Sequence, residues 1–202
     1  LDSLTRRMDY WGAQLRVADY KVETIFFGGG TPSLMENDLL VETGKRLRER
    51  FDLTSDLEWT FECNPETVTD EKIDALSAAG ANRLSVGIQS FDDKHLERLE
   101  RRARRGDNVR ALEIIAKRWN KSWSLDLMFG LPGQKREQLK PELELALSFD
   151  PPHVSAYQLT LTTARSQNWQ QAGEDDLLAM FDLTEDLLQT SGREKYETSN
   201  FA

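Results

Sequence analysis

The chain has 202 residues and a formal net charge of −9. Apolar residues make up 39% and charged residues 30%, which is typical of a globular protein with a sizeable core. The acidic balance argues against a nucleic-acid partner, and neither a membrane-spanning run nor a signal peptide is recognisable. The single cysteine, Cys63, excludes intrachain disulfides and makes a cytoplasmic location the default expectation.

Strand-like runs alternate with helical patterns along the chain. We expect strands at 22–27, 57–63, 83–88, 123–129, 153–159 and, more weakly, 195–201. Helices are predicted at 3–17, 37–51, 69–79, 92–119 with a break near Gly106, 135–148 and 174–190. One helix between successive strands predicts βαβ units and an α/β fold with a parallel sheet, either open or closed into a barrel. In both architectures ligands bind at the carboxyl ends of the strands.

Polar residues and glycines occupy those strand ends. Gly28–Thr31 follow the first strand, Glu62 lies near the end of the second, Gln89 ends the third, and Asp126 interrupts the apolar fourth. Each has a structural alternative: the glycines can form a simple turn, Glu62 can be solvated, and Asp126 can pair with an arginine or lysine. Together they favour a binding site.

A phosphate site is an alternative interpretation of the glycines. The run GGGTPS fits the dinucleotide pattern G-x-G-x-x-G at Gly28 and Gly30, but Ser33 replaces the third glycine. A nucleotide-binding (β/α) protein without iron therefore stays an alternative, although Glu62 and Asp126 would repel phosphates.

Five motifs occur in one order along the chain: GGGTPS, FECNPETV, ANRLSVGIQSF, SLDLMFGLPGQ and DPPHVSAYQLT. In this arrangement the chain resembles the radical S-adenosylmethionine proteins of the oxygen-independent coproporphyrinogen-III oxidase-like family. The resemblance covers nearly all of residues 1–160 and resumes at 174–202, where YETSNFA is similar to the family's ending.

The family has two branches, the oxidases and the haem chaperones of HemW type. Asn64-Pro65 after Glu62 and the run QSF at 89–91 are similar to the chaperone branch, whereas the oxidases more often carry DP and QDF. We therefore favour a haem chaperone, which binds haem and transfers it to an acceptor. The alternative is an oxygen-independent coproporphyrinogen-III oxidase, which performs an anaerobic oxidative decarboxylation in porphyrin biosynthesis; the sequence does not decide whether the protein is an enzyme.

The resemblance implies a partial (β/α)6 TIM-like barrel, the radical SAM core. It implies S-adenosylmethionine and a [4Fe–4S] cluster held by three cysteines as cofactors, and haem or another tetrapyrrole, a haem-acceptor protein and an electron donor as partners. The residues that match the family's cofactor contacts are Gly29, Gly30, Thr31, Glu62, Gln89, Arg101 and Asp126.

The chain departs from the family's pattern at its cysteines. The segment C-x-x-x-C-x-x-C that should precede Leu1 is not in the sequence, so no metal ligand is predicted within the chain. One thiolate cannot hold a cluster, and Cys63 is expected to be a small buried strand residue. We therefore expect residues 1–202 to be a fragment of a radical SAM core domain, without the first strand and its cluster-binding loop and without the C-terminal extension.

Two further features bear on the haem interpretation. Residues 159–175 are shorter than the corresponding family loop, which leaves open whether residues are missing there. His95 and His153, the only histidines, are expected to be surface or loop residues rather than haem ligands.

Overall fold

Strands and helices alternate along the chain, as the sequence predicts. The computed structural model describes residues 2–17, 19–161, 169 and 172–202. They divide into two compact units, one comprising the chain up to Cys63 together with Thr67–Leu84, the other comprising Asn64–Glu66 and Ser85–Ala202. None of the helices in the described part of the chain has the length and apolar character needed to cross a membrane.

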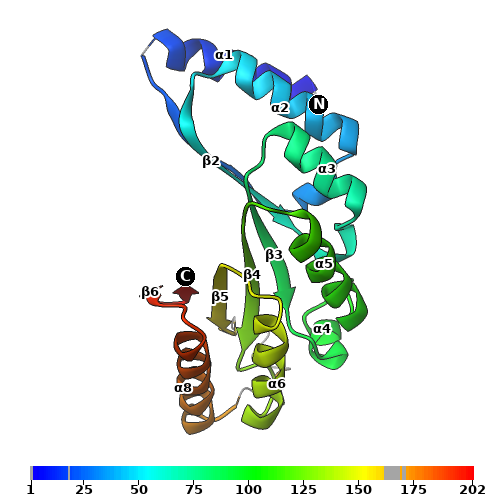
Figure 1. The fold of residues 1–202 in the computed structure, drawn as a ribbon, viewed down its shortest axis with the longest axis vertical. Helices are drawn as coiled ribbons and strands as arrows, with labels where there is room; N and C mark the ends of the chain where they lie inside the picture. The colour runs from blue at the N-terminus through cyan, green and yellow to red at the C-terminus, as the bar shows by residue number, and fades with distance from the viewer. Residues whose placement is uncertain (1, 18, 162–168, 170–171) are drawn as a thin grey trace. The chain divides into compact units, whose positions relative to one another are not determined.

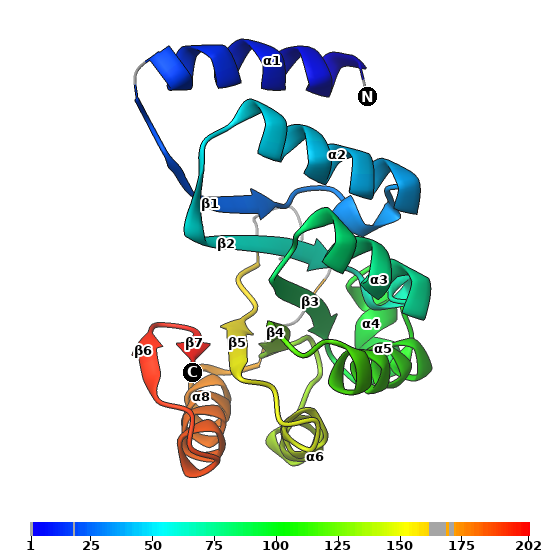
Figure 2. The same ribbon diagram turned by 45° about the horizontal axis from the view of Figure 1, so that its top comes forward.

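The first unit contains two parallel strands and three helices. Its elements are α1 (Asp2–Val17), β1 (Val22–Phe27), the short 3-10 helix Pro32–Leu34, α2 (Asn37–Arg50), β2 (Leu53–Cys63) and α3 (Asp70–Ala79). Figure 2 shows β1 beside β2, and α1 along α2. The ring of Phe27 stacks on Trp59 and Phe61, with centroids 5.7 and 5.2 Å apart. These aromatic contacts fix the parallel pair from which the loop after β1 emerges.

The second unit is a five-stranded sheet with helices. The order of its strands is β3-β4-β5-β7-β6, and β4 pairs in parallel with β5. Figure 1 shows α6 and α8 side by side. The elements are the short 3-10 helix Pro65–Thr67 (whose last residue belongs to the first unit), β3 (Arg83–Gln89, which begins in the first unit), α4 (Asp93–Arg98), α5 (Arg105–Arg118), β4 (Ser122–Phe129), α6 (Arg136–Leu147), β5 (His153–Gln158), α8 (Glu174–Thr190), β6 (Lys195–Glu197) and β7 (Asn200–Phe201).

The core follows from strand alternation. On β3, Leu84, Val86 and Ile88 have no exposed surface, while the residues between them are only partly buried. Since successive side chains of a strand point to opposite faces, this pattern directs Ser85 and Gln89 away from the core.

One predicted strand is wrong, and a predicted helix break is confirmed a few residues earlier than Gly106. The predicted strand 195–201 is a hairpin, in which Glu197 pairs with Asn200 across a two-residue turn. The break in the predicted helix 92–119 lies between Arg98 and Arg105, ahead of Gly106. The helix ends there because Glu100 adopts a left-handed φ of 58° and the N–H of Arg101 donates to the Leu96 carbonyl, a hydrogen-bonding pattern that terminates helices.

Leu112 and Leu178 give a matched test of the core. Leu112 in α5 is fully buried and Leu178 in α8 is 60% exposed. We expect Leu112→Ala to lower the free energy of unfolding by about 2–5 kcal/mol because it leaves a cavity, and Leu178→Ala by less than about 1 kcal/mol. Urea denaturation followed by circular dichroism measures both. Equal losses would contradict the assignment of α5 to the core.

Candidate functional site

The glycine loop after β1 is open and carries a carboxylate beside it. Gly29 and Gly30 have φ of 80° and 64°, and a β-carbon at either would meet no atom within 4 Å. The N–H of Gly29 donates to Glu62 Oε2 at 3.1 Å, which brings together two residues predicted from the sequence. The loop thus presents exposed backbone groups with an acidic side chain next to them, an environment that suits a bound ammonium group.

Thr31 continues this loop into the short 3-10 helix. Its carbonyl accepts from the N–H of Leu34 at 3.0 Å, and the buried Ser33 hydroxyl accepts from Thr67 Oγ1 at 2.6 Å. These bonds anchor the carboxyl side of the glycine loop, while the glycines themselves stay exposed.

Arg101 is held in the second unit by two acceptors that were not predicted as cofactor contacts. Its Nη2 donates to the Gly87 carbonyl at 2.9 Å and to Asn64 Oδ1 at 3.0 Å. The end of α4 makes this possible, because the left-handed Glu100 turns the chain just before Arg101.

Gly87 leaves the space that Gln89 and Arg101 fill. A β-carbon at residue 87 would lie 3.0 Å from Gln89 Nε2 and 3.1 Å from Arg101 Nη2. The two predicted contacts Gln89 and Arg101 are therefore neighbours, and a glycine in the strand is the sequence signal that could have indicated it.

Asp126 is only partly buried, and its Oδ2 accepts from the Ser85 hydroxyl at 3.1 Å. Its neighbours Leu125 and Leu127 point into the core. Alternation therefore places Asp126 and Ser85 on one face of the sheet, together with Gln89. The structure brings predicted residues together in two groups, Gly29 with Glu62 in the first unit and Gln89 with Arg101 in the second.

Cys63 is buried, as predicted, and is chemically unsuited to hold a metal. Burial raises the pKa of its thiol to about 12, outweighing the opposite effect of nearby Lys72. Within the part of the chain that the structure describes, no three His, Cys, Asp or Glu side chains are placed to hold a metal ion.

The two histidines are buried, so the prediction of surface positions is wrong. His95 is 5% and His153 9% exposed. His95 Nδ1 lies 4.0 Å from Glu142 Oε1, and His153 Nε2 lies 2.7 Å from the Tyr196 hydroxyl. Each ring therefore lies in the interior beside one polar side chain, not at the surface. The short segment 159–175 lies largely outside the described residues, and the question of residues missing there stays open.

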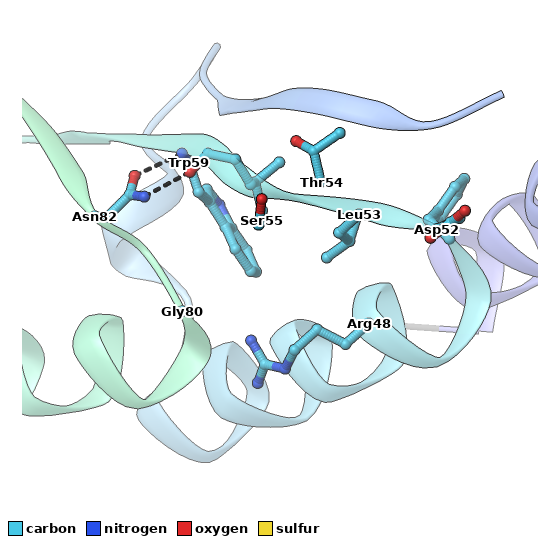
Figure 3. A pocket seen from close by; sticks show the side chains of 10 residues that line it. Arg48, Asp52, Leu53, Thr54, Ser55, Trp59, Gly80 and Asn82 are labelled. Atoms are coloured by element: carbon cyan, nitrogen blue, oxygen red, sulfur yellow. Dashed lines mark hydrogen bonds between the residues drawn. The ribbon is translucent and has the colours of Figure 1, made fainter.

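A cavity of about 480 Å³ lies at the opposite end of β2 from Glu62. Figure 3 shows its lining, which comes from the end of α2, the start of β2 and the turn after α3. Arg48 Nη1 donates to the Ala79 carbonyl at 2.6 Å, and Asn82 bonds the backbone of Leu57 and Trp59. Because ligands of parallel α/β folds bind at the carboxyl strand ends, these contacts favour a structural role for this end.

Comparison with protein families identifies the class. The model of the radical SAM superfamily matches residues 6–146, well over half of the chain. The chain therefore belongs to the radical SAM superfamily, as the five motifs and their order predict.

Proteins with similar sequences indicate which members of the superfamily the chain resembles. The chain is 38% identical over 185 residues to "Heme chaperone HemW" of Escherichia coli (strain K12), covering 90% of this chain and 49% of that protein. It is 37% identical to the protein of the same name from Haemophilus influenzae, covering 90% and 48%. It is also 38% identical to "Radical S-adenosyl methionine domain-containing protein 1, mitochondrial" of Mus musculus, covering 90% and 43%. The chain spans about half the length of these relatives.

Among solved structures, the chain resembles coproporphyrinogen III oxidase (HemN) from Escherichia coli. The TM-score is 0.89 at 24% identity, covering all of this chain and 47% of that one. At this level of identity the likeness establishes the fold. It confirms the predicted α/β class, a partial TIM-like barrel of the radical SAM type.

Cys63 offers a direct chemical test. Burial raises the pKa of the Cys63 thiol to about 12 and keeps the sulfur out of contact with solvent, so the reactive thiolate is scarce in the folded chain. We expect the folded 1–202 chain to react with a chromogenic disulfide reagent at least about a hundredfold more slowly than the chain in 6 M guanidinium chloride, in which one thiol per chain should react. Rapid reaction of the folded chain would contradict the burial of Cys63.

Proposed function

We propose that the protein is a haem chaperone of the radical SAM superfamily, which binds a [4Fe–4S] cluster, S-adenosylmethionine and haem and transfers haem to an acceptor protein. The observation that carries the proposal is the match of 90% of the chain, at 37–38% identity, to bacterial proteins named heme chaperone HemW. The likeness to HemN, at 24% identity, supports the fold rather than the oxidase activity.

S-adenosylmethionine fits the polar groups that follow the strands. The exposed glycine loop and Glu62 supply backbone groups and a carboxylate for the ammonium of its amino-acid end. We propose that Gly29, Gly30, Thr31 and Glu62 contact the cofactor in this way. Within the second unit, the Gln89 amide and the Arg101 guanidinium supply donors for its carboxylate or ribose, and Asp126 supplies an acceptor for hydroxyl groups. When bound beside a reduced cluster, this cofactor supplies a 5′-deoxyadenosyl radical in the family's enzymes.

The cluster does not fit any group of residues in this chain. Three thiolates are required, whereas the sequence contains one cysteine, whose pKa is raised to about 12 by burial. We propose that a C-x-x-x-C-x-x-C segment outside the 202 residues supplies the ligands, and that these residues are part of a longer core domain. This proposal agrees with the relatives being about twice as long.

The glycine loop also weighs against the phosphate alternative. A Gly29 N–H that would cradle a phosphate already donates to the Glu62 carboxylate, and a phosphate there would meet a like charge. The haem acceptor, the electron donor and a cytoplasmic location belong to the proposal, and neither histidine is assigned as a haem ligand.

The first test compares the two branches. The full-length protein, prepared without oxygen and with its cluster reconstituted, should retain haem through gel filtration at about one haem per chain, measured by absorbance. Given S-adenosylmethionine, a reductant and coproporphyrinogen III, it should form no decarboxylated porphyrinogen, whereas an oxidase measured in parallel should. Decarboxylation by this protein would replace the proposal with the oxidase.

The second test concerns Glu62. We expect Glu62→Gln to weaken S-adenosylmethionine binding by about 10- to 100-fold, because a charge-assisted contact to the ammonium contributes about 1.5–3 kcal/mol. Equilibrium dialysis with labelled cofactor measures the dissociation constant. Glu58→Gln is the matched control, since Glu58 is exposed in the same strand, nearer its amino end. Equal binding by the two variants would remove Glu62 from the cofactor site.

A further inference from the structure

Gln89 has a strained backbone at the end of β3. Its φ is 65°, a region that side chains other than glycine rarely adopt. The N–H of Ser90 donates to the Ile88 carbonyl at 2.8 Å, so Gln89 is the central residue of a tight three-residue γ-turn. A γ-turn of this handedness is rare and costs about 1–3 kcal/mol, so the surrounding structure has to maintain it.

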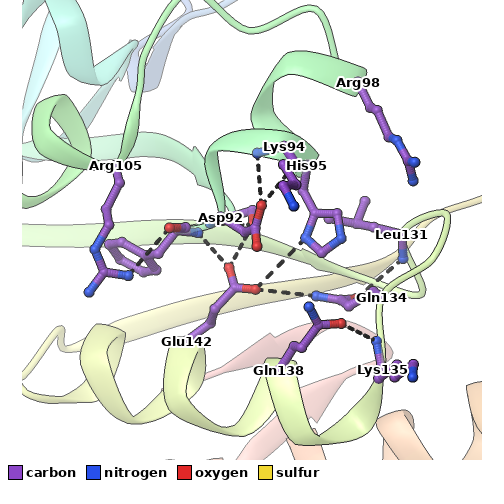
Figure 4. Close-up of polar contacts among 12 residues, drawn as sticks. Asp92, Lys94, His95, Arg98, Arg105, Leu131, Gln134, Lys135, Gln138 and Glu142 are labelled. Carbon is purple, nitrogen blue, oxygen red and sulfur yellow. Dashed lines mark hydrogen bonds and ion pairs between the residues drawn. The ribbon is translucent and has the colours of Figure 1, made fainter.

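A buried carboxylate holds the residues after the turn. Glu142 of α6 is 7% exposed, and its Oε2 accepts from the Ser90 hydroxyl at 2.6 Å and from the N–H of Phe91. Its Oε1 lies 3.5 Å from Gln134 Nε2 and 4.0 Å from His95 Nδ1. Figure 4 shows the Glu142 side chain at the centre of these contacts.

A buried amide holds the turn from a second helix. Asn108 of α5 has no exposed surface, and its Nδ2 donates to the Ile88 carbonyl at 3.0 Å and the Ser90 carbonyl at 2.8 Å. Asn108 thus binds the carbonyls on both sides of Gln89, while Glu142 binds the donors that follow. Since these groups are buried, moving the turn would leave several of them without hydrogen bonds.

The direction of the Gln89 side chain depends on this turn. Its Nε2 reaches the space left by Gly87, next to Arg101 Nη2. Arg101 in turn is bonded to the Gly87 carbonyl and to Asn64. An extended backbone at residue 89 would keep the side chain on this face of β3 but start it about 7 Å beyond residue 87. The turn therefore determines how closely the amide folds back over Gly87, not which face it occupies.

We infer that Glu142 and Asn108 are positioning residues. They hold Gln89 in its left-handed turn and thereby orient its side-chain amide to hydrogen-bond S-adenosylmethionine. This inference rests on the proposed function, in which Gln89 and Arg101 contact that cofactor. Neither Glu142 nor Asn108 touches the cofactor itself; each acts through residue 89.

The test is a double-mutant cycle on the full-length, cluster-loaded protein, with the dissociation constant of S-adenosylmethionine as the readout. We expect Glu142→Gln to weaken binding about fivefold, because a neutral amide replaces a charged acceptor. In the Gln89→Ala background the same change should have no further effect. Glu144→Gln, an exposed position on the same helix, is the matched control and should leave binding unchanged.

Amide hydrogen exchange tests the turn itself. Exchange at Ser90 and Phe91 should be faster in Glu142→Gln than in wild type or Glu144→Gln. Asn108→Ala removes the amide donors that come from the other helix. Its effect on S-adenosylmethionine binding should also disappear in the Gln89→Ala background. This variant replaces Glu142→Gln in the cycle if Glu142→Gln does not fold.

The outcomes separate the two ideas. If wild-type protein binds no S-adenosylmethionine, the proposed function fails and this inference with it. If wild type binds, but the losses from Glu142→Gln and Gln89→Ala add fully, or Glu142→Gln causes none, only the inference is overturned. Unchanged exchange at Phe91 in Glu142→Gln also overturns it.

Discussion

The alternation of side chains along strands that are buried on one face governs the candidate site. On β3, Val86 and Ile88 fill the core, so Ser85 and Gln89 must point to the other face. On β4, Leu125 and Leu127 do the same, which leaves Asp126 opposite the core and within reach of the Ser85 hydroxyl. A shift of one residue in either strand would bury a carboxylate or an amide among apolar side chains. The strand register that buries the apolar side chains therefore also determines where the polar side chains of the candidate site lie.

Much of this arrangement was predictable from local sequence. Runs of apolar residues predict the strands. Glu62, Gln89 and Asp126 are candidate contacts because they are polar residues in or at the ends of those strands. The glycine loop and its neighbour Glu62 are indeed in contact. What local sequence could not supply were partners from distant elements. Glu142 lies 52 residues beyond the Ser90 whose hydroxyl it binds. Its spacing places it on the buried face of α6 with Leu139, Leu143 and Ala146, but the sequence does not indicate which buried groups it binds.

The errors have the same origin. His95 is buried beside Glu142, which belongs to α6 and is distant in the sequence, so the local pattern around His95 does not show its burial. The position of the break after α4 depends on a left-handed Glu100, whereas sequence reasoning looks for a glycine. The pattern at 195–201 predicts one strand rather than a hairpin because the turn residues, Thr198 and Ser199, are neither glycine nor proline, and Thr favours strands. Backbone conformations held by tertiary contacts leave little trace in composition.

The buried thiol of Cys63 has a practical consequence for iron chemistry. Iron–sulfur proteins are commonly loaded with an excess of ferrous iron and sulfide, and any accessible thiolate then competes for metal. Cys63 lies 3% exposed and stays protonated at the pH of such procedures. In the folded state Cys63 therefore does not compete for the added metal. Iron retained by the full-length protein after desalting would then need no correction for Cys63.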